Sequence, residues 1–240
     1  MYAILSDIHS NYEALKNVVA DLKNYSLSAI FVLGDIIGYG PDPNACVEEM
    51  QKLGVKAIQG NHERALKNFD FLNSFNPLAA ETITWTGKKL DRSHMEYLEN
   101  LPEQHLENEM TFVHGSLLDP DKYILEYADI LQEMEILRLK GKKIEFFGHT
   151  HMKIIYVEDE GPITPNQEWI KLNHNKIYLI NPGSVGQPRD REPAASYVIF
   201  DPANYRILYR QIPYDVNATI AKMKKEGFPA FTYNRLKLGI

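Results

Sequence analysis

The stretch YAILSDIHSNYEALKNVVADL, residues 2–22, establishes the pattern that the rest of the chain follows. Its first four residues are a short apolar run, which is typical of a buried strand. The polar segment SDIH at residues 6–9 comes next. SNYE at residues 10–13 then fits a capping box, and Leu15, Val18 and Leu22 follow at the spacing of one helical face. We therefore predict a strand, a polar turn and an amphipathic helix.

The same rhythm continues beyond this first unit. Residues 29–33 (AIFVL) and 55–58 (VKAI) predict two more buried strands. The helix predicted between them has Pro43 at its first position and ends at Gly54. Strands that alternate with helices over short links indicate parallel pairing with right-handed crossovers.

The remainder of the chain predicts a second layer of strands. Residues 63–101 favour helices, strands are expected at 110–113 and 144–147, and a helix is expected at 128–139. The last third is β-rich, with strands predicted at 153–157, 176–180, 196–200 and 206–212. We expect these to pair largely antiparallel in a second sheet packed on the first, with 158–167 as a mobile surface loop. The prediction is one α/β domain over residues 1–240, with two sheets and helices outside.

Composition excludes several classes of protein. The 240 residues are 44% hydrophobic and 24% charged, the balance of an ordinary globular chain. The net charge of −6 argues against polymeric nucleic acid as a partner, since a phosphate backbone requires a basic surface. No apolar run approaches the roughly 18 residues of a membrane span, and the first residues do not form a signal peptide. Cys46 is the only cysteine, so we expect no intrachain disulfide and a cytoplasmic location.

Polar residues gather where the predicted strands end. The segments are SDIH (residues 6–9), GDIIG (34–38), GNHE (60–63), HGS (114–116) and GHTH (148–151), and they hold five of the eight histidines. Ligands bind at the carboxyl edge of open α/β sheets. Asp, His and Asn without thiolates suit divalent or trivalent first-row metals, and their number is about enough for two ions. We expect Asp35 to bridge them, and the net positive centre would suit an anionic substrate such as phosphate.

Each of these residues also has a plainer explanation. Asp and Asn are favoured wherever strands break into turns, and a histidine can simply occupy a strand end. A structural histidine would look the same as His62 in the sequence. It is the occurrence of five such segments in one order that favours a metal site over turn chemistry.

Taken in order, the motifs resemble the calcineurin-like metallophosphoesterase superfamily. The matching residues are Asp7 and His9, Gly34-Asp35-x-x-Gly38, Gly60-Asn61-His62-Glu63, His114, and Gly148-His149-x-His151. Asp35 lies 28 residues after Asp7 and 26 before Asn61, which also fits. NPGSVGQPRD at residues 181–190 resembles the compact bacterial and archaeal phosphodiesterase branch. The fold that the resemblance implies is a double β-sandwich of two mixed sheets flanked by helices.

The resemblance also implies roles for individual residues. One metal would be held by Asp7, His9, Asp35 and His151, and the second by Asp35, Asn61, His114 and His149. Manganese is the favoured ion, with iron, nickel, cobalt or zinc as alternatives. A hydroxide that bridges the metals would attack phosphorus, and His62 would protonate the leaving group as general acid. Glu63 would support a ligand or its loop.

The remaining candidates concern substrate and partners. Arg64 and Arg189 are possible phosphate clamps, because guanidinium forks match phosphate geometry. The expected substrate is a small phosphate ester, with a phosphodiester favoured over a monoester, and a homodimer is possible. The alternatives are a protein-interaction scaffold on the same fold, which would be expected to have lost some of these side chains, and a nuclease, which the acidic balance disfavours.

Overall fold

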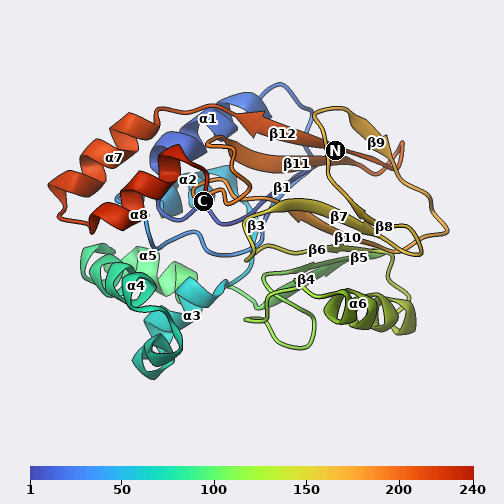
Figure 1. Cartoon of the computed structure of the whole chain (residues 1–240), viewed down its shortest axis with the longest axis horizontal. Helices are drawn as coiled ribbons and strands as arrows, with labels where there is room; N and C mark the ends of the chain where they lie inside the picture. Colours follow the sequence, from blue (N-terminus) through green and yellow to red (C-terminus); the bar gives the residue numbers. More distant parts are fainter.

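Two six-stranded sheets lie face to face in the computed structural model, which describes residues 1–240 apart from the side chain of Phe69 (Figure 1). The first sheet has the order β3-β2-β1-β11-β12-β9. Its strands are β1 (Tyr2–Leu5), β2 (Ala29–Val32), β3 (Lys56–Ala57), β9 (Trp169–Lys171), β11 (Ala195–Asp201) and β12 (Arg206–Ile212). As predicted, β1, β2 and β3 are parallel, whereas β11 pairs antiparallel with β1.

The second sheet has the order β4-β5-β6-β10-β7-β8. Its strands are β4 (Gln104–Glu107), β5 (Met110–Val113), β6 (Ile144–Phe146), β7 (Lys153–Val157), β8 (Gly161–Ile163) and β10 (Tyr178–Pro182). Strand β10 pairs parallel with β6 and antiparallel with β7, so this sheet is mixed as well. Both sheets are therefore mixed and flanked by helices, as the resemblance implied.

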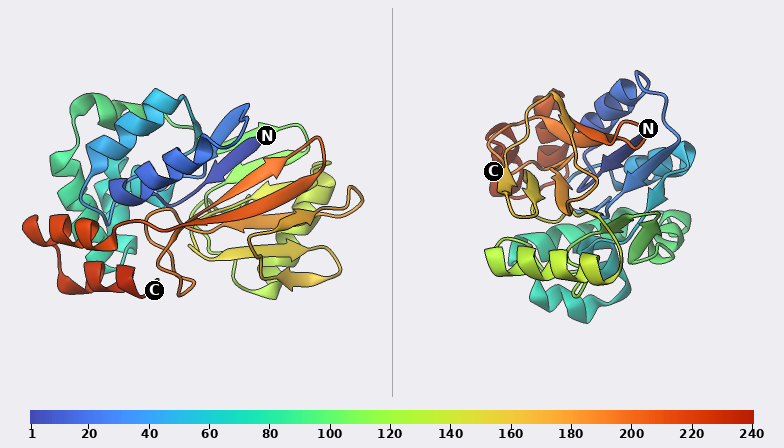
Figure 2. Two further views of the ribbon diagram at one scale, coloured as in Figure 1. Left: turned by 90° about the horizontal axis from the view of Figure 1, so that it is seen from above. Right: turned by 90° about the vertical axis from the view of Figure 1, so that its right-hand side faces the viewer.

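Helices cover the outer faces of the two sheets. They are α1 (Tyr12–Leu22), α2 (Pro43–Leu53), α3 (Asn61–Lys67), α4 (Pro77–Lys89), α5 (Arg92–Glu99), α6 (Tyr127–Leu139), α7 (Val216–Lys225) and α8 (Ala230–Asn234), with 3-10 turns η1 (Phe69–Ser74) and η2 (Arg235–Lys237). Helix α6 packs on the second sheet, while α1 packs on β11 and β12 of the first and also contacts α7. Figure 2 shows the C-terminal helices (red) and the N-terminal helices (blue) at the same end of the sheets. No helix of the described chain combines the length and hydrophobicity needed to cross a bilayer.

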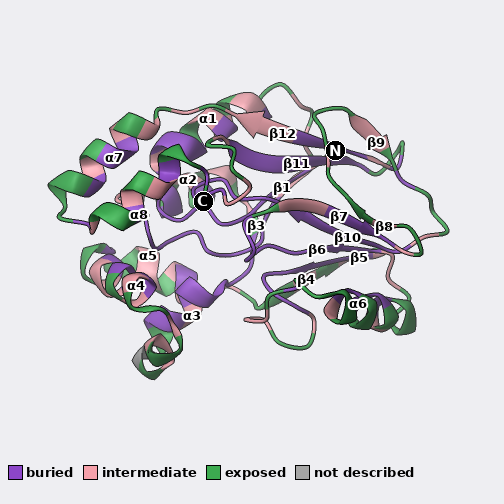
Figure 3. Ribbon diagram, viewed as in Figure 1, coloured by how far each residue is buried: buried purple, intermediate pink, exposed green. Residues whose placement is uncertain are grey.

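Successive side chains of a strand point to opposite faces of its sheet, so the core is divided into one layer between the sheets and others beneath the helices. Ala3 and Leu5 of β1 pack outward against the helices, while Ile4 points between the sheets. The layer between the sheets includes Phe31 and Phe112, whose rings stack with centroids 4.0 Å apart. Figure 3 shows the central strands coloured as buried, whereas the helices around them carry exposed stretches.

Three expectations from the sequence were wrong. The strands of the last third do not form a sheet of their own: β9, β11 and β12 join the first sheet, and β7, β8 and β10 join the second. The predicted loop 158–167 contains β8, which pairs with β7 in a hairpin. The strand predicted at 176–180 is displaced to Tyr178–Pro182, because apolar runs that are buried on both faces carry no alternation to mark their ends.

The first helix begins one residue later than the capping box predicted. Asn11 is its N-cap, and its side-chain oxygen accepts a hydrogen bond from Ala14 N at 3.2 Å, while Ser10 has a φ of +51°. Asn11 also donates to Gly186 O and accepts from Thr219 Oγ1 of α7. This cap therefore ties the start of α1 to the C-terminal part of the chain.

Replacing Phe31 by alanine is expected to lower the free energy of unfolding by about 3–5 kcal/mol, since it leaves a cavity between the sheets. The Phe31 side chain is 1% exposed. Phe231→Ala is the matched control, because this ring is 62% exposed and its loss should cost at most about 0.5 kcal/mol. Urea denaturation measures both, and a Phe31→Ala variant as stable as the control would contradict the assignment of this layer as the core.

Candidate metal centre

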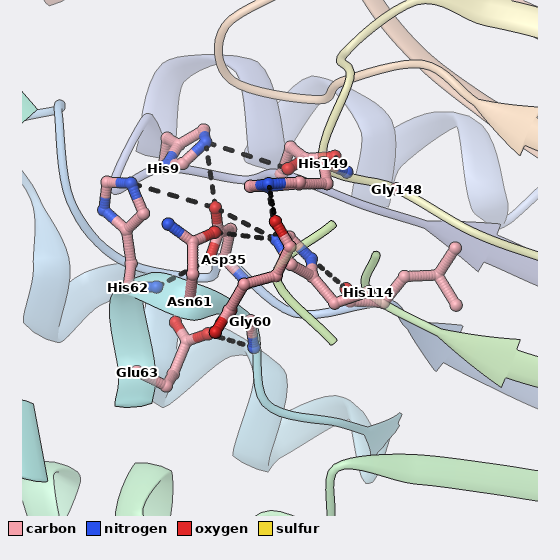
Figure 4. Close-up of polar contacts among 12 residues, drawn as sticks. His9, Asp35, Gly60, Asn61, His62, Glu63, His114, Gly148 and His149 are labelled. Atoms are coloured by element: carbon pink, nitrogen blue, oxygen red, sulfur yellow. Dashed lines mark hydrogen bonds and ion pairs between the residues drawn. The ribbon is translucent and has the colours of Figure 1, made fainter. Parts of the chain in front are cut away.

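The five polar segments meet at one edge of the sheets, where strands β1, β2, β3, β5 and β6 end (Figure 4). The loops after β1 and β2 run beside one another, since His9 N donates to Asp35 O at 2.9 Å and Ser10 N donates to Ile36 O at 2.9 Å. Gly148 N donates to His114 O at 2.8 Å, which joins the loops of the second sheet. Residues far apart in sequence are thus held side by side by backbone hydrogen bonds.

The first group of candidate ligands is Asp7, His9, Asp35 and His151, all buried. The Nε2 atoms of His9 and His151 lie 3.1 Å apart. Asp7 Oδ1 lies 3.3 Å from His151 Nε2, and Asp35 Oδ2 lies 3.6 Å from His9 Nε2. Four ligand atoms therefore surround a single position.

The second group is Asp35, His114 and His149, and Asn61 adjoins it. His114 Nε2 lies 2.9 Å from Asn61 Oδ1, 3.1 Å from His149 Nδ1 and 3.4 Å from Asp35 Oδ2. The structure therefore brings together all seven side chains that the sequence singled out as ligands, with Asp35 in both groups.

The histidine rings are oriented so that their lone pairs converge. Nδ1 of His9 contacts Ile37 O at 3.0 Å, Nδ1 of His114 contacts Leu33 O at 2.7 Å, and Nδ1 of His151 contacts Gln187 O at 2.6 Å. A carbonyl oxygen only accepts, so each Nδ1 carries a proton, and each ring in its neutral form presents a lone pair at Nε2. This arrangement is typical of metal-ligating histidines.

The electrostatics of the two groups favour a bound cation. Burial raises the pKa of Asp7 to about 7, and Asp7 Oδ1 has no hydrogen-bond partner among the described residues. Burial lowers the pKa of His114, but the Asp35 carboxylate outweighs it and raises that pKa to about 9. Burial lowers the pKa of His9, His149 and His151, so these three rings are neutral and offer lone pairs to a metal ion rather than binding a proton. Facing lone pairs, an unpartnered buried carboxylate oxygen and hard-to-borderline donors all fit transition-metal binding.

His62 lies beside these groups without belonging to either. Its Nε2 is 3.8 Å from Asp35 Oδ2, and its backbone N donates to Asp35 Oδ1 at 3.0 Å. Its ring packs against Tyr39, with centroids 4.9 Å apart, and lies 4.7 Å from the ring of His9. Burial lowers its pKa to about 4. The ring thus faces the shared carboxylate from one side of the centre.

Glu63 holds the loop that carries Asp35. Its carboxylate accepts hydrogen bonds from the backbone N of Asp35, Ile36, Ile37 and Gly60, at 2.8 to 3.2 Å. Burial and the neighbouring Asp35 carboxylate raise the pKa of Glu63 to about 7, and these hydrogen bonds favour its ionised form. Glu63 therefore has the supporting position that the sequence predicted, through the loop rather than through a ligand side chain.

The ligand loops are strained in a way that the sequence did not reveal. Five candidate ligands have positive φ, namely Asp7 (+54°), His9 (+48°), Asp35 (+51°), His149 (+65°) and His151 (+59°). Each such residue costs roughly 1–3 kcal/mol, and strain of this kind concentrates at functional sites. The backbone hydrogen bonds between the loops and the Glu63 carboxylate offset this cost.

Gly34 and Gly38 are required by close approaches. Gly34 has a φ of +88°, and a Cβ there would lie 2.3 Å from Gly60 N. Gly38 has a φ of +87°, and a Cβ there would lie 1.9 Å from His62 Nδ1. The spacing of the GDIIG segment thus lets the Asp35 loop pack against both Gly60 and the His62 ring.

The two candidate arginines differ in their surroundings. Arg64 is paired with Asp121 and also donates to Gln59 O and Pro120 O. Arg189 lines the cavity beside the candidate ligands, where its Nη2 donates to Gln187 Oε1 at 2.9 Å and its buried Nε has no partner among the described residues. The buried Nε of Arg64 has no partner among the described residues either, so what distinguishes Arg189 is its place in the cavity wall.

Sequence reasoning missed several residues that line this cavity. Tyr123 stacks on the His149 ring with centroids 3.8 Å apart, and Phe75 meets the His62 ring edge-on at 5.5 Å. Tyr123 follows a turn-rich stretch, whereas Phe75 lies in the stretch 63–101 that favours helices, and neither pattern marks a cavity wall.

Gly38→Ala is expected to destabilise the protein more than Gly141→Ala. Gly141 has a similar φ of +65°, but an added Cβ there meets nothing within 4 Å. Both alanines bear the left-handed strain, whereas only the one at position 38 overlaps the His62 ring, and such overpacking costs about 1–3 kcal/mol more. Urea denaturation of the two variants measures the difference. Equal losses of stability would contradict this expectation and show that the His62 ring moves aside freely.

A first-row transition metal such as Mn²⁺, added after chelator treatment, is expected to raise the midpoint of thermal unfolding. An ion that binds only the folded chain stabilises it by about 2.7 kcal/mol at a hundredfold excess over Kd. His151→Ala should lose most of this response, whereas His174→Ala, which removes an exposed ring, should retain it. A wild-type protein that responds to none of these metals would contradict the metal assignment.

Comparison with known proteins identifies the family. Residues 1–204 match the calcineurin-like phosphoesterase superfamily domain. The whole chain is 36% identical to an uncharacterized protein of Methanocaldococcus jannaschii and covers 98% of it. A metallophosphoesterase from Sphaerobacter thermophilus is 35% identical with a TM-score of 0.87, covering 100% of this chain and 98% of that one. A hypothetical protein from Pyrococcus horikoshii OT3 shares the fold at 20% identity, with a TM-score of 0.83, over 100% and 99% of the two chains. The chain therefore belongs to the calcineurin-like phosphoesterase superfamily.

Proposed function

We propose that this protein is a dinuclear, metal-dependent phosphoesterase that hydrolyses a small phosphate ester, with a phosphodiester as the favoured substrate. The family is metal-dependent and its members are phosphoester hydrolases. The observation that best supports a pair of metals is the position of Asp35, whose Oδ2 lies 3.6 Å from His9 Nε2 and 3.4 Å from His114 Nε2. One carboxylate thus serves both groups.

In this proposal, Asp7, His9, Asp35 and His151 hold one ion, and Asp35, Asn61, His114 and His149 hold the other. Manganese remains the favoured ion, because Asp, His and Asn ligands without thiolate suit it. When bound, such a pair supplies Lewis-acid activation of the phosphate and of the attacking water. A cytoplasmic location belongs to the same proposal and is supported by Cys46, which is buried and free.

His62 acts as the general acid in this mechanism. Burial lowers its pKa to about 4, which makes the protonated ring a strong proton donor. An anion nearby favours the charged form of a histidine, so substrate binding itself promotes protonation of the ring. His62 then donates that proton to the departing oxygen as the ester bond breaks.

Arg189 is the proposed phosphate contact. It lies at the cavity wall, and its guanidinium keeps donors that no described residue uses. Arg64 is the weaker candidate, because it does not line the cavity and its Nη1 and Nη2 already donate to Asp121 and two backbone carbonyls.

The decisive experiment compares His62→Gln and Asp35→Asn by bound metal and by hydrolysis of aryl phosphate mono- and diesters with added Mn²⁺. His62→Gln should retain its metals and lose roughly 10²–10⁴-fold in rate, the contribution of a general acid. Asp35→Asn should lose metal and activity together, because it weakens both groups. His174→Gln, at an exposed ring, is the control and should change neither.

Other outcomes would contradict separate parts of the proposal. A His62→Gln variant as fast as wild type on a poor leaving group would remove His62 from the mechanism. Faster hydrolysis of monoesters than of diesters would reverse the substrate preference. A metal-loaded protein that hydrolyses neither would favour a scaffold over an enzyme.

A further inference from the structure

A cavity of about 290 Å³ opens beside the candidate metal centre. This volume is at the lower end of the range for small-molecule sites. It has room for a phosphate with one ring-sized substituent. Its lining includes His62, Phe71, Phe75, Asn76 and Arg189.

The wall next to His62 is aromatic. Phe75 meets the His62 ring edge-on with centroids 5.5 Å apart, and Phe71 meets Phe75 in the same way at 5.4 Å. The Tyr39 ring also packs against His62, with centroids 4.9 Å apart. Phe71 lies in η1 and Phe75 directly follows it, so this 3-10 turn supplies the wall.

The polar side chains of this wall are largely engaged within their own turn. Ser74 Oγ donates to Phe71 O at 2.7 Å. Asn76 caps α4, where its Oδ1 accepts from Ala79 N at 3.0 Å. A polyhydroxylated leaving group would need free donors and acceptors in this place, and the wall offers it few.

Apart from the proposed metal ions, the permanent positive charge along the cavity comes from one described side chain. Arg189 is the one arginine or lysine among the described lining residues, and the nearby Asp121 is paired with Arg64. A polyphosphate chain carries several negative charges and is favoured by several cationic partners. The cavity therefore suits an ester with a single phosphate.

From this geometry we infer that the leaving group of the substrate contains an aromatic ring, which packs against Phe75. The inference rests on the proposed function, because a proton donor must lie beside the oxygen that leaves. If His62 is that donor, the leaving group lies on the side that Phe75 and Phe71 enclose. Aromatic rings pack edge-to-face or offset against such side chains.

The test uses two methyl phosphodiesters whose leaving alcohols have the same acidity, one a phenol and one a fluorinated alkyl alcohol. Equal acidity removes the chemical advantage of the phenol, so any difference in kcat/KM reports recognition. Wild type is expected to prefer the aryl ester by about 5- to 100-fold, the range that stacking of one ring supplies. A nucleoside methyl phosphodiester, run alongside, shows whether the ring can be carried on a sugar.

Phe75→Leu should remove most of that preference, while leucine retains the packing of this position on the core. Phe75→Tyr keeps the ring and should preserve the preference. Phe231→Leu, which alters an exposed ring on α8, should change nothing. Bound metal, measured for every variant, shows that the centre is intact.

Each outcome decides between defined alternatives. A preference for either aromatic ester that depends on Phe75 supports the inference. Hydrolysis of the two acidity-matched esters at equal rates by wild type, or an equal loss on every ester in Phe75→Leu, overturns the inference and leaves the proposed function standing. Hydrolysis of none by the metal-loaded wild type overturns the proposed function and the inference together.

Discussion

The structure depends on holding two lone pairs face to face: the Nε2 atoms of His9 and His151 lie 3.1 Å apart. Each ring is fixed from behind by a backbone carbonyl, so neither can turn its N–H toward the other. Asp7 and Asp35 add negative charge to the same position. Such a set is unfavourable by itself and becomes favourable around a cation, so the fold must supply the rigidity that holds it.

That rigidity comes from the backbone rather than from the ligands. Backbone hydrogen bonds join the loops after β1 and β2, and the Glu63 carboxylate accepts hydrogen bonds from three backbone N–H groups of the second loop. This scaffold keeps ligand residues at positive φ that would relax in an isolated loop. Gly34 and Gly38 allow the scaffold to close without steric overlap. The glycines of the motif therefore determine geometry, while the acids and histidines determine chemistry.

Local features of this protein were readable from its sequence, whereas long-range partners were not. The bounds predicted for β1, β5, β7 and β12 agree with the structure, because short apolar runs between turn residues are distinctive. The ligand segments were identifiable because chemistry restricts which residues can serve. The sheet to which β11 belongs was not, since all of its residues are buried and its pattern favours neither face. The left-handed ligand residues and the aromatic wall around Phe75 depend on contacts between distant segments, which no local pattern encodes.

The pairing of β1 has a consequence for how the protein is made. Ala3 lies opposite Ile199 in the antiparallel pair of β1 and β11, and on its other side β1 pairs with β2. During translation, one edge of β1 therefore has no pairing strand until nearly the whole polypeptide has left the ribosome. Such non-local closure is slow and exposes strand edges to aggregation, so we expect the nascent chain to depend on chaperones until β11 has emerged.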